Sequence, residues 1–122
     1  MDARSFEALV VAAVESLPEE IKQKLENVGV VIEDEPTAEH KKAGGSNEDG
    51  YLMGLYQGVP LSKRMHYYGN VLPDKITIFK NNIERVCRTD DDIKEAVRRT
   101  VIHEFAHHFG ISDEHMKNSG TY

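Results

Sequence analysis

The sequence has a single cysteine among its 122 residues. One thiol, Cys87, cannot form a disulfide framework within the chain, and small secreted domains usually carry an even number of cysteines. We therefore expect a reducing, cytoplasmic setting in which Cys87 is a small buried hydrophobic residue. Long apolar runs are also missing. No stretch approaches the roughly 18 residues that a membrane-spanning helix requires, so we expect no membrane partner.

Basic residues are fewer than acidic ones. The chain has 15 lysines and arginines against 21 aspartates and glutamates, for a formal net charge of −6. This balance argues against sequence-independent binding of nucleic acid, which needs a basic surface to displace counterions from phosphates. The length excludes a two-domain enzyme and, with 39% hydrophobic and 30% charged residues, predicts a single globular domain over residues 1–122.

The first half of the chain predicts two helices and one strand. Apolar residues recur at three and four positions from Phe6 to Leu17, as on one stripe of an amphipathic helix. Because the apolar cluster in this stretch follows acidic residues, it is a poor match to a signal peptide. Pro18 is suited to start a second, short helix over Pro18–Asn27. The β-branched run Val28–Ile32 predicts a strand, and the polar, glycine-rich stretch Asp34–Gly50 predicts a long surface loop.

The second half predicts two further strands and a long helix. Alternating side chains indicate strands over Tyr51–Leu61 and Lys75–Phe79, and one or two helical turns are expected over Asn81–Val86. Thr89 and the acidic run Asp90–Asp92 are typical of a helix N-terminus, and this helix extends to Phe109, before Gly110. We therefore expect an α+β fold with a small sheet, mostly antiparallel or mixed and of about three strands, packed on helices.

Histidine is concentrated in one place. Four of the six histidines lie between His103 and His115. The long helix contains His103-Glu104-Phe105-Ala106-His107, the pattern HExxH, whose spacing of four places the two imidazoles one turn apart on one helix face. Two imidazoles so placed can hold a single cation, with Glu104 beside them as a general base. This pattern is typical of zinc peptidases.

The match extends beyond the two histidines. Gly110 and Asp113 complete HExxHxxGxxD, and the chance occurrence in a chain of this composition falls from roughly 3% for the short pattern to about 0.05% for the long one. Gly110 can turn the chain back sharply, so that Asp113 approaches the metal from a third direction. Two alternatives stay open: Asp113 is the N-cap of a terminal helical turn, or His115 is the third ligand.

The ligand count predicts the chemistry. Three protein ligands, His103, His107 and Asp113, leave a fourth zinc position open for water, as in catalytic rather than structural zinc sites. Glu104 would then accept a proton from water and pass it to the leaving amine. A helical wheel places His103, Glu104 and His107 on the arc that carries Ile93 and Val97, so we expect the site to face the core.

The sequence at this point resembles a known family. The segments HEFAHHFGISDEHM, GLYQGVPLSKR (54–64) and LPDKITIFKNNI (72–83) are similar to the small bacterial zincin-like metallopeptidases, and the likeness covers most of the chain from about Val28 onward. It implies a minimal zincin fold, zinc on His103, His107 and Asp113, Glu104 as the base, and a peptide or unfolded protein as substrate. Nine residues follow Asp113, so we expect no downstream Met-turn and a shallow cleft.

The remaining residues have plainer interpretations. We expect His108 to be a packed or partly exposed residue at the edge of the core. We expect His66, Tyr67 and Tyr68 to belong to a polar, aromatic loop rather than to bind substrate. In zincins an edge strand pairs with the extended substrate, and Lys75–Phe79 is the candidate here. We interpret Asp34–Gly50 as a surface loop rather than as a lid over the site.

Two other functions compete with a peptidase. The chain is alternatively a non-catalytic, zinc-binding regulatory or interaction module, or a peptidase that needs a partner to complete its cleft. Glu104 favours the enzyme, because a purely structural zinc site needs no general base. The sequence leaves the oligomeric state open.

Overall fold

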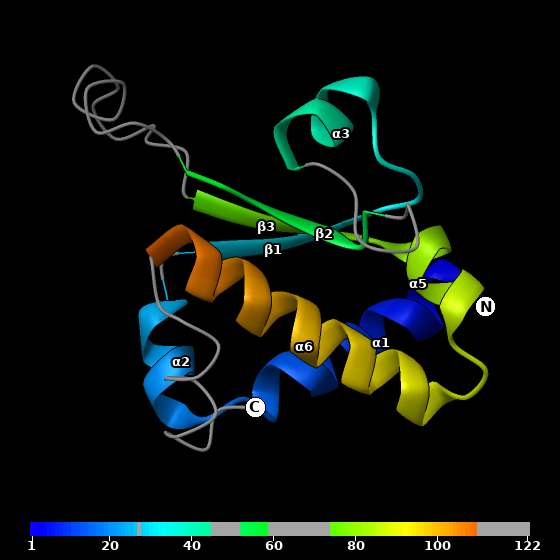
Figure 1. Ribbon diagram of the computed structural model, residues 1–122. Helices are drawn as coiled ribbons and strands as arrows, with labels where there is room; N and C mark the ends of the chain where they lie inside the picture. The colour runs from blue at the N-terminus through cyan, green and yellow to red at the C-terminus, as the bar shows by residue number, and fades with distance from the viewer. Residues whose placement is uncertain (27, 45–51, 59–73, 110–122) are drawn as a thin grey trace.

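The computed structural model describes residues 1–26, 28–44, 52–58 and 74–109. The elements in these residues are the helices α1 (Ala3–Glu15), α2 (Glu19–Lys24), α3 (Ala38–Gly44), α5 (Lys80–Val86) and α6 (Asp90–Phe109), and the strands β1 (Val28–Glu33), β2 (Gly54–Gln57) and β3 (Asp74–Phe79) (Figure 1). The predicted α+β class is confirmed. No helix of the described residues is long and apolar enough to cross a membrane.

The three strands form one mixed sheet in the order β1-β3-β2. β1 runs parallel to β3, with Val30 opposite Ile76, and β2 runs antiparallel to β3, with Tyr56 also opposite Ile76. β3 is therefore the central strand. Lys75–Phe79, the candidate for the substrate-pairing strand, cannot have this role, because strands already occupy both of its sides.

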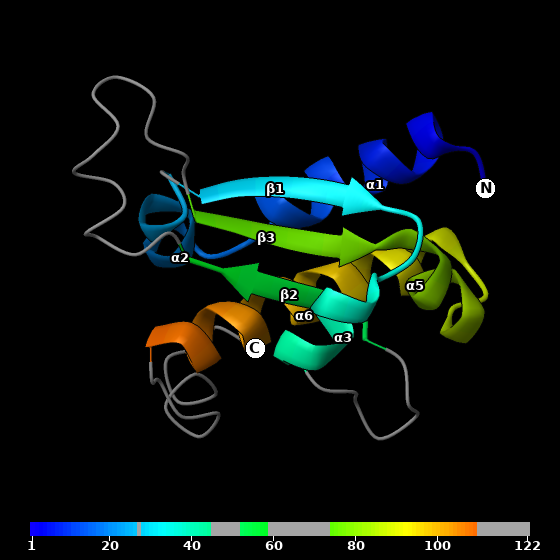
Figure 2. The ribbon, with the colours of Figure 1, turned by 90° about the horizontal axis from the view of Figure 1, so that it is seen from above.

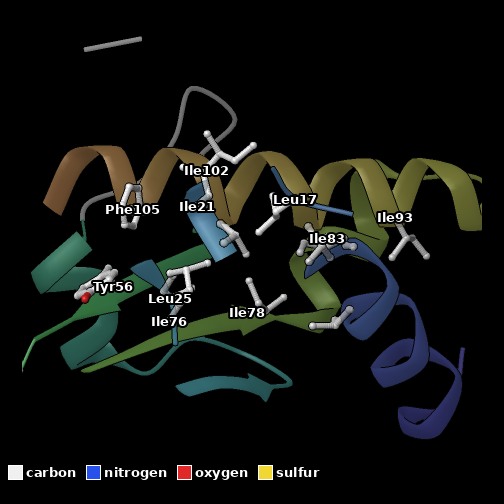
Figure 3. Close-up of a cluster of buried hydrophobic side chains, with 14 of the residues drawn as sticks. Leu17, Ile21, Leu25, Tyr56, Ile76, Ile78, Ile83, Ile93, Ile102 and Phe105 are labelled. Carbon is white, nitrogen blue, oxygen red and sulfur yellow. The ribbon is translucent and has the colours of Figure 1, made fainter. Parts of the chain in front are cut away.

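Helices cover the sheet unequally. α1, α2 and α6 lie on one side of the sheet and α3 on the other (Figures 1 and 2). Ile76 and Ile78 of the central strand are fully buried on the side of α1 and α6, in one core cluster with Ile102 and Phe105 of α6 (Figure 3). Phe79 belongs to a smaller cluster with Leu52 and Leu55. The site helix α6 is thus anchored on the main core.

The segment predicted as a long loop contains a helix. α3 spans Ala38–Gly44, inside the stretch Asp34–Gly50. Its first turn is capped reciprocally, since the Thr37 N–H donates to His40 Nδ1 over 3.0 Å and the His40 N–H donates to Thr37 Oγ1 over 3.2 Å. The His40 ring also lies 5.0 Å from that of Phe79. The helix was missed because few of its residues are apolar, so no periodicity marks it.

The other elements match their predictions within a few residues. Pro18 is the N-cap of α2, which ends at Lys24. Of the predicted strand Tyr51–Leu61, residues 54–57 form β2, residues 52, 53 and 58 do not, and the others lie outside the described residues. Residues 45–51 and 59–73 are outside the described residues, as are His66, Tyr67 and Tyr68.

Candidate metal and active site on helix α6

Helix α6 begins at a capping box. The Asp92 carboxylate accepts hydrogen bonds from the backbone N–H groups of Arg88 and Thr89, and Thr89 Oγ1 accepts one from the Asp92 N–H. These bonds, the one from Arg88 foremost, lower the pKa of Asp92 below its ordinary value. The acidic first turn is therefore a helix-start signal, as predicted.

The face that α6 buries differs from the predicted one. Its buried residues are Ile93, Val97, Val101, Ile102, Phe105 and Ala106. His103 and His107 are exposed, and Glu104 is half-buried. The expectation that the zinc-site face is the core-facing face is therefore wrong. The apolar row continues through Val101 and Phe105, and the two histidines lie on the other side of Glu104 on the helix.

A single row of residues on α6 meets strand β2. Thr100, Glu104 and His108 contact alternate positions of the strand and the residue after it, namely Gly54, Tyr56 and Gly58. The spacing explains the fit, because four helical residues rise about 6 Å and two strand residues about 6.7 Å. Every fourth residue of the helix can therefore lie opposite every second residue of the strand over this length.

The central contact of this row orients the predicted base. The backbone N–H of Tyr56 donates a hydrogen bond to Glu104 Oε1 over 2.9 Å. Tyr56 thus points its N–H away from β3 and toward α6, as alternate residues of an antiparallel edge strand do. In the described residues Glu104 has this one hydrogen bond, so its second oxygen, Oε2, is not engaged.

The flanking contacts fix how closely β2 approaches. A Cβ atom added to Gly54 would overlap Thr100 Cγ2 and would lie 3.1 Å from the Thr77 carbonyl oxygen. A Cβ atom added to Gly58 would lie 3.0 Å from the His108 ring. Both glycines therefore allow an approach that a side chain would obstruct. No positive φ is needed to explain them.

The Tyr56 side chain ties three elements together. Its hydroxyl donates to Asp74 Oδ2 over 2.8 Å, and its ring stacks on His108 with centroids 3.9 Å apart and planes 20° apart. His108 is exposed to solvent and also packed against this ring, which agrees with the predicted packed or partly exposed residue at the edge of the core. Sequence reasoning missed Tyr56 and Asp74 as site residues. Their proximity depends on the pairing of β2 with β3, which no local pattern reveals.

The metal ligands are only partly within the described residues. His103 and His107 lie one turn apart on α6, beside Glu104, and their donor chemistry suits zinc. No third histidine, cysteine or carboxylate completes a metal-binding group within residues 1–26, 28–44, 52–58 and 74–109. Asp113 and its rival His115 are outside these ranges, so the third ligand stays a prediction. Cys87 is half-buried, and burial raises the pKa of its thiol.

A helix carrying HExxH beneath a mixed sheet with an antiparallel edge strand defines the zincin class. The family model described as zincin-like metallopeptidase matches residues 25–121, and the chain belongs to this family. No protein of curated function is significantly similar to it.

A solved structure agrees on the fold. The chain is similar to a conserved hypothetical protein from Thermus thermophilus, with a TM-score of 0.55 and 25% sequence identity. The match covers 89% of this chain and 94% of that one. The similarity therefore extends over nearly the whole domain.

Proposed function

We propose that the chain is a zinc-dependent peptidase in which His103, His107 and Asp113 hold the metal and Glu104 is the general base. The observation that carries the proposal is the Tyr56–Glu104 hydrogen bond, which holds a half-buried carboxylate beside two exposed imidazoles. Zinc, when bound, supplies Lewis acidity toward the water and the scissile carbonyl.

The two oxygens of Glu104 have separate tasks in this proposal. Oε1 is held by the Tyr56 N–H, and Oε2 takes the proton of the attacking water. The hydroxyl adds to the carbonyl carbon, Glu104 delivers the proton to the amide nitrogen, and the C–N bond breaks. The remaining proton of the added hydroxyl passes to the leaving amine as well, so the products are one carboxylate and one protonated amine, and protons and electrons balance.

Strand β2 is the better candidate for substrate pairing. It is an edge of the sheet, antiparallel to β3, and it lies along α6 next to Glu104. At this edge the Tyr56 N–H is already bonded to Glu104, so an extended peptide would pair with the remaining backbone groups of β2, and its own backbone would lie close to the base. Peptides and unfolded proteins satisfy this requirement, because their backbone is not already paired within a sheet.

The exposure of His103 and His107 favours a second candidate, a peptidase whose site another polypeptide completes. A partner that covers the imidazoles would exclude water and strengthen their electrostatic interactions. In that case the purified chain binds zinc but cleaves peptides only with the partner added.

The test compares wild type with Glu104→Gln. We expect both to bind about one zinc per chain by metal analysis, and the variant to lose hydrolysis of a peptide library by about 10²- to 10⁴-fold. Glu95→Gln is the matched control, since Glu95 is an exposed glutamate of the same helix paired with Arg99. A folded, chelator-free preparation without zinc would refute the proposal, as would cleavage that survives in Glu104→Gln.

A further inference from the structure

The sheet has a second edge, on the side away from β2. β1 is paired with β3 on one side, and within the described residues no strand occupies the other. Val31 at this edge is 39% exposed. Natural edge strands are usually protected by lysine, proline or a bulge. Residues Val28–Glu33 contain none of these, and their single charge, Glu33, lies 3.5 Å from His40 of α3.

Helix α1 extends beyond this edge. Figure 2 shows α1 reaching past β1, so the helical layer is wider than the sheet above it. A groove of about 640 Å³ lies between them, lined on the helix by Val10, Val11 and Val14 and on the strand by Val30, Val31 and Ile32. Val11 is 49% exposed. The groove thus has an apolar floor and an open backbone edge.

Acidic side chains surround the groove. Glu7, Glu15 and Asp34 line it, and in the described part of the chain none of their carboxylates forms an ion pair. The one basic residue, Lys80, is already neutralised by Glu84 at 3.2 Å. The rim therefore carries uncompensated negative charge. A second copy would bring the same carboxylates to its partner, so like-charge repulsion argues against self-association here.

The spacing of the acids specifies a ligand. Glu7 and Glu15 are eight residues apart on α1, or about 12 Å along the helix. Side chains four residues apart on one face of a strand are about 13 Å apart. Basic residues at positions i and i+4 of an added strand therefore reach the two glutamates, and an apolar residue at i+2 meets Val11 and Val14.

We propose that the β1 edge and α1 form a docking surface for an extended segment of another protein with the pattern basic-x-apolar-x-basic. The segment adds a fourth strand to the sheet. Backbone hydrogen bonds to β1 supply affinity, and the groove with its two glutamates selects the side chains. The surface is separate from α6, so the proposal is independent of the zinc chemistry.

Peptide binding tests it. The probes are the synthetic peptide Thr-Lys-Thr-Val-Thr-Lys-Thr and the same peptide with both lysines changed to glutamate, measured by calorimetry on full-length Glu104→Gln protein to prevent cleavage. We expect the basic peptide to bind more tightly, by about tenfold, and its affinity to fall with salt. Chelation of zinc is expected to leave the affinity for the basic peptide unchanged, which separates this result from the proposed peptidase activity.

Charge reversal sharpens the test. Glu7→Lys/Glu15→Lys is expected to reverse the preference, so that the acidic peptide binds better. Glu20→Lys/Glu26→Lys, two exposed glutamates away from the groove, is the matched control and keeps the original preference. Every second peptide nitrogen can be methylated in two alternative patterns, and the pattern that removes the N–H donors facing β1 is expected to abolish binding.

Three results would overturn the proposal. The first is equal binding, or no binding, of the two peptides. The second is binding that survives both patterns of backbone methylation, which would exclude strand addition. The third is self-association of the free protein in sedimentation that depends on Val11 or Val31, which would assign the edge to a second copy.

Discussion

The backbone N–H of Tyr56 donates a hydrogen bond to the Glu104 carboxylate over 2.9 Å, and this bond joins the edge strand to the site helix. Two further close approaches flank this bond: Gly54 lies against Thr100, and Gly58 lies against His108. The Glu104 carboxylate is therefore oriented by a backbone N–H group. Replacing the Tyr56 side chain does not remove this donor. Its position can be changed only by moving the strand or the helix.

Gly54→Ala is expected to move the strand. The new Cβ would overlap Thr100 Cγ2, so β2 must shift, at a cost of about 1–3 kcal/mol in the free energy of unfolding and with a larger loss of peptide hydrolysis than of zinc binding. Thr100→Ser removes Cγ2 and should restore part of both. Gly29→Ala is the control, because its Cβ would lie at an ordinary 3.9 Å from the nearest atom, the Asp74 carbonyl oxygen. Equal effects at the two glycines would contradict this account.

The two contacts of the Tyr56 side chain, the hydrogen bond to Asp74 and the stacking on His108, can be tested separately. Tyr56→Phe removes the hydrogen bond to Asp74 but keeps the ring on His108, and is expected to cost about 1 kcal/mol in denaturant unfolding. Tyr56→Ala removes both contacts and leaves a cavity, at a cost of about 3 kcal/mol or more. If the two variants are equally stable, the stacking contributes nothing.

The zinc ligands are tested by metal affinity. His103→Ala and His107→Ala should each weaken zinc binding by more than about 100-fold in a competition assay with a chelator. His108→Ala is the neighbouring control, since His108 stacks on Tyr56, and it should retain the metal. Asp113→Ala and His115→Ala, compared in the same assay, identify the third ligand. Full zinc affinity in both of these variants would exclude each residue from the site.

Acid sensitivity follows from the cap of α6. Because hydrogen bonds from Arg88 and Thr89 lower the pKa of Asp92 in the folded protein, its charge stabilises the fold above the ordinary carboxyl pKa of 3.8. That contribution is lost as the pH falls through the lowered value. Asp92→Ala should therefore destabilise the protein at neutral pH, and the difference from wild type should shrink in acid. Asp91→Ala, which removes an acid of the same turn without these bonds, should show less pH dependence.

Sequence alone predicted the helix boundaries that depend on local chemistry. Thr89 and the acidic run Asp90–Asp92 marked the start of α6, where the structure shows a capping box. HExxH placed His103, Glu104 and His107 together through the fixed geometry of one helix. The zincin-like family followed from the same motif and its flanking segments. Local hydrogen bonding and helical spacing require no knowledge of the rest of the fold.

The tertiary fold is needed to show which side of that helix meets which strand. The wheel could not show that Val101 and Phe105 continue the buried row while the histidines remain exposed, because the wheel contains no neighbours. Nor could it show that β3 is central and β2 is the edge beside Glu104. Strand order and register arise from pairing between residues distant in sequence. Glu104 can therefore be identified as the predicted base from the sequence motif, whereas its hydrogen-bond partner, the Tyr56 N–H, is known only from the fold.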